Sequence, residues 1–263
     1  MEQIEKALAK AKEMRYGGGA IPLPIREHAS SAVNGVTPEY TETFVVAADQ
    51  VRSQAQRLVA DSIDQKASHV YGLLRTQVLQ RMRARGFSSL VVTGPALGCG
   101  ASTTAANLAV AIALDVNQTV LLVDLNLRSP SVSKKFNFEP RAGIDDYLRN
   151  QATLKDCLVS PRIPRLVILP ARRANSDAAE ILSSPRMTAL SRELRSRYAD
   201  RIIIYDAPPL LSSSDTLGFL PNADAVLLVA QSGKTTRQEI EKSAELLNGK
   251  VLLGTLMNAH GAA

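Results

Sequence analysis

A glycine-rich turn between a strand-like run and a helix-like run constrains this chain most. Residues 94–104 read GPALGCGASTT, and they connect the apolar run 88–93 to a helix-like run at 101–114. In the phosphate-binding pattern GxxxxGK[ST], a lysine and then a Ser or Thr follow the second glycine. Here Ala101 holds the lysine position and Ser102 follows it. The turn is predicted to keep a backbone cradle for phosphate at the helix start, without the cation that supports phosphoryl transfer.

The residues of this turn are the candidate cofactor ligands. Backbone N–H groups of Gly98, Gly100 and Ala101 are predicted to face phosphate oxygens, and the hydroxyl groups of Ser102 and Thr103 to bind phosphate. The Ser102 hydroxyl is also a candidate Mg²⁺ ligand, because that role does not need a lysine beside it. The expected cofactor is ATP or ADP with Mg²⁺, bound weakly or not at all. The alternative is an ordinary strand-to-helix turn in which the hydroxyls cap the helix.

Two more apolar runs each end in an aspartate. Residues 120–123 precede Asp124, and residues 202–205 precede Asp206. Continuous short apolar runs are typical of buried parallel strands, whose carboxyl ends form the ligand edge of the sheet. A pair of carboxylates there suits a Mg²⁺–nucleotide site, since one holds the metal or its water shell and the other orients an attacking group. A single such aspartate is often only a helix cap.

Strands and helices alternate along most of the chain. A helix is predicted over 64–84, with apolar residues on one stripe. The alternation favours an α/β fold with a doubly wound, mostly parallel sheet. The strands are expected at residues 88–93, 119–124, 165–169, 201–206, 225–231 and 251–257.

These motifs resemble the cytoplasmic ATPase domain of bacterial tyrosine kinases, a P-loop, MinD-like family tied to capsule and exopolysaccharide synthesis. The family motif VDxDxR corresponds to VDLNLR at 123–128, and its Asp-x-Pro-Pro motif to DAPP at 206–209. The likeness spans roughly residues 66–258. It implies a protein-tyrosine kinase as the nearest activity, a membrane chain-length determinant or polysaccharide co-polymerase as partner, and a homo-oligomer as one assembly.

The resemblance also implies roles for single residues. Asp124, Asp206 and Arg128 become the catalytic candidates, with Asp124 and Asp206 joining Ser102 as candidate metal ligands. Asn258, at the end of the last strand, becomes a candidate adenine contact. The alternatives are a surface ion pair for Arg128 and a turn-forming asparagine at 258.

Departures from the family pattern weaken three parts of a kinase cycle. Transfer is affected at Ala101 and at Asn126, where the second aspartate of VDxDxR is an amide. The terminal tyrosine cluster is missing, because the last tyrosine of the chain is Tyr205. The family's Glu-x-x-Arg-x-x-Arg ring motif keeps only its last residue, at positions His69, Gly72 and Arg75. Impaired catalysis and a monomer or dimer are therefore expected.

The N-terminal part is expected to lie outside the main domain. Residues 1–14 are predicted to form a docking helix, 15–60 a mostly irregular linker with Gly and Pro, and 61–263 the kinase-like domain. An apolar patch at 44–48 is either a stray strand or a partner contact.

Composition and charge indicate where the protein is located and which partners it binds. The chain has 263 residues, two cysteines and a net charge of +6, with no apolar stretch near the ~20 residues of a membrane helix. We expect a cytoplasmic protein, held at the inner face of the plasma membrane through a partner. The basic surface is expected to be mainly a solvated face, so nucleic acid is not favoured.

Three functions remain open on these grounds. The first is a degenerate kinase-like protein that regulates polysaccharide chain length or export by binding. The second is an active autokinase or ATPase that uses a non-standard cation such as Arg128 or Lys234. The third is a ParA/MinD-type partitioning ATPase, against which the missing lysines count.

Overall fold

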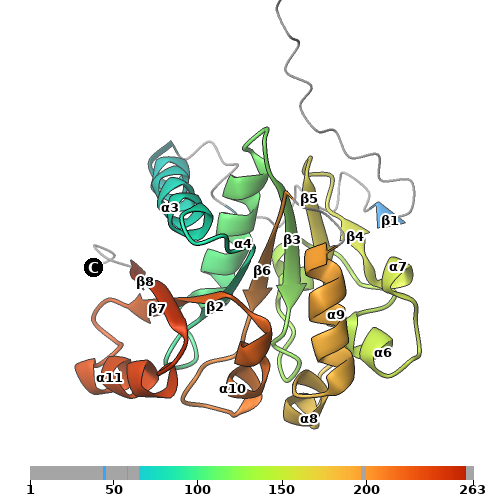
Figure 1. The fold of residues 1–263 in the computed structure, drawn as a ribbon. Coiled ribbons are helices and arrows are strands. Elements are labelled where there is room, and N and C mark those ends of the chain that lie inside the picture. The colour runs from blue at the N-terminus through green and yellow to red at the C-terminus, as the bar shows by residue number, and fades with distance from the viewer. Residues whose placement is uncertain (1–43, 46–57, 59–64, 197–199, 259–263) are drawn as a thin grey trace, which may run out of the picture. The chain divides into compact units, whose positions relative to one another are not determined.

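The described part of the chain builds one sheet with helices on both faces (Figure 1). The computed structural model describes residues 44–45, 58, 65–196 and 200–258. Within them, eight strands lie in the order β1-β4-β5-β3-β6-β2-β7-β8, all parallel to their neighbours except β4 against β5. The strands are β1 (Phe44–Val45), β2 (Ser89–Thr93), β3 (Thr119–Asp124), β4 (Val159–Ser160), β5 (Leu166–Leu169), β6 (Arg201–Asp206), β7 (Ala225–Gln231) and β8 (Val251–Asn258).

Alternate side chains of the central strands enter two separate hydrophobic clusters. On β3, for example, Leu122 belongs to one cluster and Leu121 to the other. Helices α3 and α4 pack on the first cluster, and α6 to α11 pack on the second. The helices are α3 (Gln65–Arg83), α4 (Ala101–Ala113), α5 (Val132–Lys135), α6 (Ile144–Leu148), α7 (Leu154–Cys157), α8 (Ala178–Leu182), α9 (Pro185–Ser196), α10 (Asp215–Phe219) and α11 (Arg237–Leu246), with a 3₁₀ turn at Leu220–Asn222.

The predicted doubly wound α/β fold is confirmed. All six expected strands are present within a residue of their predicted bounds, and the helix expected at 64–84 is α3. Val78 and Met82 of its apolar stripe are buried in the first cluster. The antiparallel β4 was not predicted, since a two-residue strand gives no periodic signal.

The segment before α3 is described only in small part. Phe44–Val45 pairs with β4 in parallel, so the strand interpretation of the apolar patch holds there. Leu58, within the range predicted as a linker, is buried in the first cluster. The predicted docking helix at 1–14 and the rest of the linker lie outside the described residues, and the domain boundaries stay predictions. No helix in the described ranges has both the length and the apolar character needed to cross a membrane.

Candidate functional site

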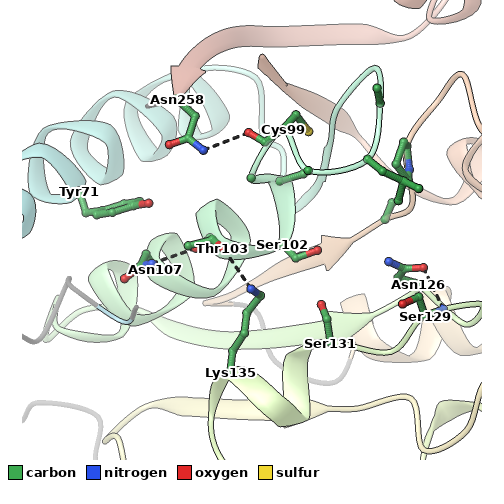
Figure 2. Close-up of a pocket in the computed structure, with 17 residues that line it drawn as sticks. Tyr71, Cys99, Ser102, Thr103, Asn107, Asn126, Ser129, Ser131, Lys135 and Asn258 are labelled. Atoms are coloured by element: carbon green, nitrogen blue, oxygen red, sulfur yellow. Dashed lines mark hydrogen bonds between the residues drawn. The ribbon is translucent and has the colours of Figure 1, made fainter. Parts of the chain in front are cut away.

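The carboxyl ends of β2, β3, β6 and β8 meet around a cavity of about 570 Å³ (Figure 2). The turn after β2, the segment after β3 and the first residues of α4 all contribute to its walls. Several of the sequence-predicted residues line it, namely Gly98, Gly100, Ala101, Ser102, Thr103 and Asn258. The structure therefore brings the predicted phosphate loop and the end of the last strand into one site.

The glycines of the loop give the chain its shape. Gly98 and Gly100 have φ angles of 81° and 92°, in the left-handed region that glycine adopts without strain. A Cβ atom at Gly100 would collide with the side-chain amide of Asn258. That amide donates a hydrogen bond to the carbonyl oxygen of Cys99, at 3.0 Å. Asn258 thus supports the loop directly, a contact that neither the adenine nor the turn interpretation included.

The other side of the loop is fixed by the segment after β6. The N–H of Leu210 donates to Gly94 O at 2.9 Å, and the N–H of Leu211 donates to Pro95 O at 3.1 Å. Burial raises the pKa of the Cys99 thiol, which therefore stays protonated and packs under the loop. Helix α4 starts after Gly100, and no side chain caps its N-terminus. The residues of its first turn line the cavity, so their backbone N–H groups have no side-chain cap there.

The two predicted aspartates are neighbours across the sheet. Asp124 and Asp206 are paired in register at the ends of β3 and β6, and both are fully buried. Burial raises the pKa of Asp124 to about 6, although three backbone N–H groups stabilise its charged form. Oδ1 accepts from the N–H of Asn126 at 3.0 Å, and Oδ2 accepts from those of Ser131 and Val132, each at 3.0 Å. Asp124 therefore holds the segment that follows β3.

Asp206 is in the opposite situation. Neither of its carboxylate oxygens has a hydrogen-bond partner of good geometry among the described residues. Burial raises the pKa of Asp206 well above its usual value and the charge of Asp124 raises it further, while the Ser102 hydroxyl and Lys135 lower it. A buried carboxylate that lies beside a hydroxyl and makes no hydrogen bond of good geometry suits a divalent cation, which takes oxygen ligands.

The residues present would suit a Mg²⁺ ion that is bound partly by the protein and partly by nucleotide phosphates and water. Within the described residues, no group of three or more His, Cys, Asp or Glu side chains could hold a metal ion. Mg²⁺ commonly uses one or two carboxylates together with substrate phosphates and water. Ser102 and Asp206 match that donor set, whereas the oxygens of Asp124 already accept three hydrogen bonds.

Arg128 lies away from the cavity walls. Its guanidinium binds Asp215 through Nε–Oδ2 at 2.7 Å and Nη2–Oδ1 at 3.2 Å, and it donates to Ser176 O at 2.9 Å. The structure thus shows the ion-pair alternative for this residue. Lys234 does not line the cavity either. Asn126 does, and its Oδ1 accepts from the N–H of Ser129 at 3.3 Å within its own turn.

Sequence reasoning missed Lys135. This residue ends α5, and its Nζ donates to Thr103 Oγ1 at 3.0 Å, as Figure 2 shows. Of the described residues that line the cavity, it is the one with a positive charge. The only signal in the sequence was a pair of lysines at 134–135, ten and eleven residues after the end of β3, and no spacing rule links such a pair to the loop.

Comparison with known proteins gives the family. No family model matches the chain. It is 33% identical over 210 residues to the tyrosine-protein kinase YwqD of Bacillus subtilis, covering 78% of this chain and 87% of YwqD. The chain belongs to the bacterial tyrosine-protein kinase family. The resemblance predicted from the motifs is therefore confirmed.

Longer relatives match over part of their length. The chain is 29% identical over 235 residues to EpsB of Ralstonia solanacearum, a match that covers 88% of this chain and 31% of EpsB. It is 31% identical over 165 residues to the succinoglycan biosynthesis transport protein ExoP of Rhizobium meliloti, covering 60% of this chain and 20% of ExoP. The chain thus spans under a third of each of these two proteins.

Solved structures agree with the family and the fold. The chimeric protein CapA2B2 is 27% identical with a TM-score of 0.69, and the match covers 82% of this chain and 92% of that one. The kinase domain of VpsO is 27% identical with a TM-score of 0.65, covering 74% and 97%. MinD of Pyrococcus horikoshii, solved with Mg-ADP, is 22% identical with a TM-score of 0.56 over 66% and 71%, which is a likeness of fold alone.

Proposed function

We propose that this chain is a nucleotide-binding, tyrosine-kinase-like protein of capsule or exopolysaccharide synthesis whose phosphoryl transfer is impaired. The observation that carries the proposal is the cavity itself. It keeps the glycine loop, the uncapped start of α4 and the hydroxyls of Ser102 and Thr103, but Ala101 brings no charge to the lysine position. Such a site favours holding phosphates over stabilising the charge that develops during transfer.

Mg²⁺ would enter this site with the nucleotide. Ser102 and Asp206 are the residues that would hold it, because the Asp206 carboxylate lies beside the Ser102 hydroxyl and makes no hydrogen bond of good geometry. When bound, the ion would neutralise part of the phosphate charge. Asp124 would act indirectly, by holding the segment from Asn126 to Val132 against the site.

Regulation through a membrane partner is the second part of the proposal. The relative ExoP is named as a transport protein of succinoglycan biosynthesis, which supports a place in a polysaccharide system. The partner we propose is a membrane chain-length determinant or co-polymerase, contacted by the predicted docking helix at residues 2–14. Chain length or export would then respond to whether the cavity holds nucleotide, and the protein would lie at the membrane only through this partner.

The other two functions are less well supported. A partitioning ATPase rests on the MinD likeness, which is limited to the fold. An active autokinase with a non-standard cation gains no support from Arg128, which is bound to Asp215, or from Lys234, which does not line the cavity. The contact between Lys135 and Thr103, the two retained aspartates and the kinase relatives are the observations in its favour.

We expect the purified protein to bind ADP or ATP weakly and to transfer phosphate on the order of 10²–10³-fold more slowly than a relative that keeps the loop lysine. The reason is the loss of a charge-stabilising group, which commonly costs that factor in rate. Calorimetry with ADP and Mg²⁺, and incorporation of labelled phosphate from ATP, measure the two quantities. Robust Mg²⁺-dependent autophosphorylation that disappears in Asp206→Ala would overturn the proposal.

We also expect a monomer or dimer in solution rather than a closed ring. On α3, His69 is exposed and Gly72 has open space where a side chain would stand. Arg75, the retained member of the ring motif, donates from Nη1 to Ala111 O of its own α4 at 3.2 Å. Light scattering of the purified chain measures the mass, and a stable octamer without a partner would contradict this expectation.

A further inference from the structure

We propose that Lys135 supplies the phosphate-binding cation that the loop lacks at Ala101. The inference rests on the proposed nucleotide site and names the positive group of that site. The cation would come from a different element, because α5 follows β3 in the chain whereas the loop follows β2. The ligand class is the di- or triphosphate of a nucleotide.

The first support is the place of the ammonium group. Lys135 Nζ lies 3.0 Å from the hydroxyl of Thr103, the third residue of α4. Figure 2 shows the side chain extending from α5 toward that first turn, beside Ser102 and Ser131. A phosphate held at the start of α4 would therefore meet the ammonium group as well as the backbone N–H groups.

The second support is that the backbone holds Lys135 in this position. Asp124 accepts hydrogen bonds from Ser131 and Val132, the residues that begin α5. Val132 and Phe136 are fully buried in the first hydrophobic cluster. Lys135 lies between these two anchors and is partly buried, whereas its neighbour Lys134 is exposed. The direction of Lys135 is thus set by packing before any ligand arrives.

The third support is electrostatic. A cation beside the first turn of a helix is repelled by the positive end of the helix dipole, so the position is favourable only with negative charge nearby. Asp206, which interacts electrostatically with Lys135, supplies negative charge at this place. A nucleotide brings several more negative charges to the same place. If Lys135 served only to neutralise Asp206, its loss would change stability and leave nucleotide affinity alone.

The test compares matched variants of neighbouring lysines. We expect Lys135→Met to weaken ADP and ATP binding, measured by calorimetry with Mg²⁺, about 10- to 100-fold, as for loss of a charge-assisted hydrogen bond. Lys134→Met, on the exposed side of the same helix, should bind like the unmodified protein. Lys135→Arg keeps the charge and should lose only a few-fold. Melting temperatures without nucleotide check that each variant is folded.

Adding Ala101→Lys closes a double-mutant cycle. If Lys135 stands in for the loop lysine, Ala101→Lys should improve affinity much more in the Lys135→Met background than in the unmodified protein. Equal affinities for Lys135→Met and the unmodified protein, or additive effects in the cycle, overturn the role of Lys135 and leave the nucleotide site standing. Binding by Ala101→Lys alone, with none in the unmodified protein, overturns the role of Lys135 and also the proposal that the unmodified protein binds nucleotide. Absence of binding in every variant overturns the proposed nucleotide site and this inference together.

Discussion

Lysine in place of Ala101 is expected to raise phosphoryl transfer on the order of 10²-fold over the unmodified protein. Ala101 is the first residue of α4 and lines the cavity next to Ser102, so a lysine there would start at the cavity wall, close to a bound phosphate. The charge that builds up on a transferring phosphoryl group is stabilised by cations placed before the reaction starts. Lys135 contacts Thr103 instead, two residues further along α4. It therefore supports binding more than transfer.

The rate gain is measured as turnover of ATP by the purified Ala101→Lys variant at saturating Mg²⁺. Ala101→Met is the control, since it adds a side chain of similar length without charge. A second change, Asn126→Asp, restores a carboxylate on the segment after β3 and should add to the gain, because Asn126 also lines the cavity. Equal turnover in the lysine and methionine variants would show that a missing charge is not what limits this protein.

The central strands of the sheet could be predicted from the sequence. Runs such as 120–123 and 202–205 are apolar throughout because they are buried on both faces between two helical layers. The two short strands beyond β5, β4 and β1, gave little signal. β4 has two residues and owes its existence to pairing with β5, so no local pattern marks it.

Only part of the site could be predicted from the sequence, because the rest depends on contacts between residues far apart in the chain. Glycines and strand-end aspartates identify a ligand edge by their type and position alone, and both predicted aspartates do lie there. The different roles of the two aspartates depend on hydrogen-bond partners that could not be predicted from the sequence. Asp124 is occupied by N–H groups up to eight residues further on, and Arg128 by Asp215, 87 residues away. Lys135 reaches the loop across 32 residues of chain, a contact that exists only once α5 is packed.

The difference between the two aspartates leads to the second large effect, which is on stability. In the absence of nucleotide, Asp124→Asn should lower the free energy of unfolding by about 2–4 kcal/mol. One amide group cannot accept from all three N–H groups of Asn126, Ser131 and Val132, and its own NH₂ would face donors. Relief of the repulsion between the two carboxylates offsets part of that loss and does not reverse it.

Asp206→Asn is the matched change, and we expect the opposite sign. Its carboxylate oxygens have no well-placed partners among the described residues and face the charge of Asp124, so an uncharged amide of the same shape should raise the free energy of unfolding by about 1–2 kcal/mol. Chemical denaturation at neutral pH without nucleotide measures both variants. Added Mg-ADP should stabilise the unmodified protein and Asp206→Asn to different extents, because only the former offers a carboxylate to the metal. Destabilisation of similar size in both variants would show that Asp206 is a structural anchor like Asp124, and would remove it from the candidate metal ligands.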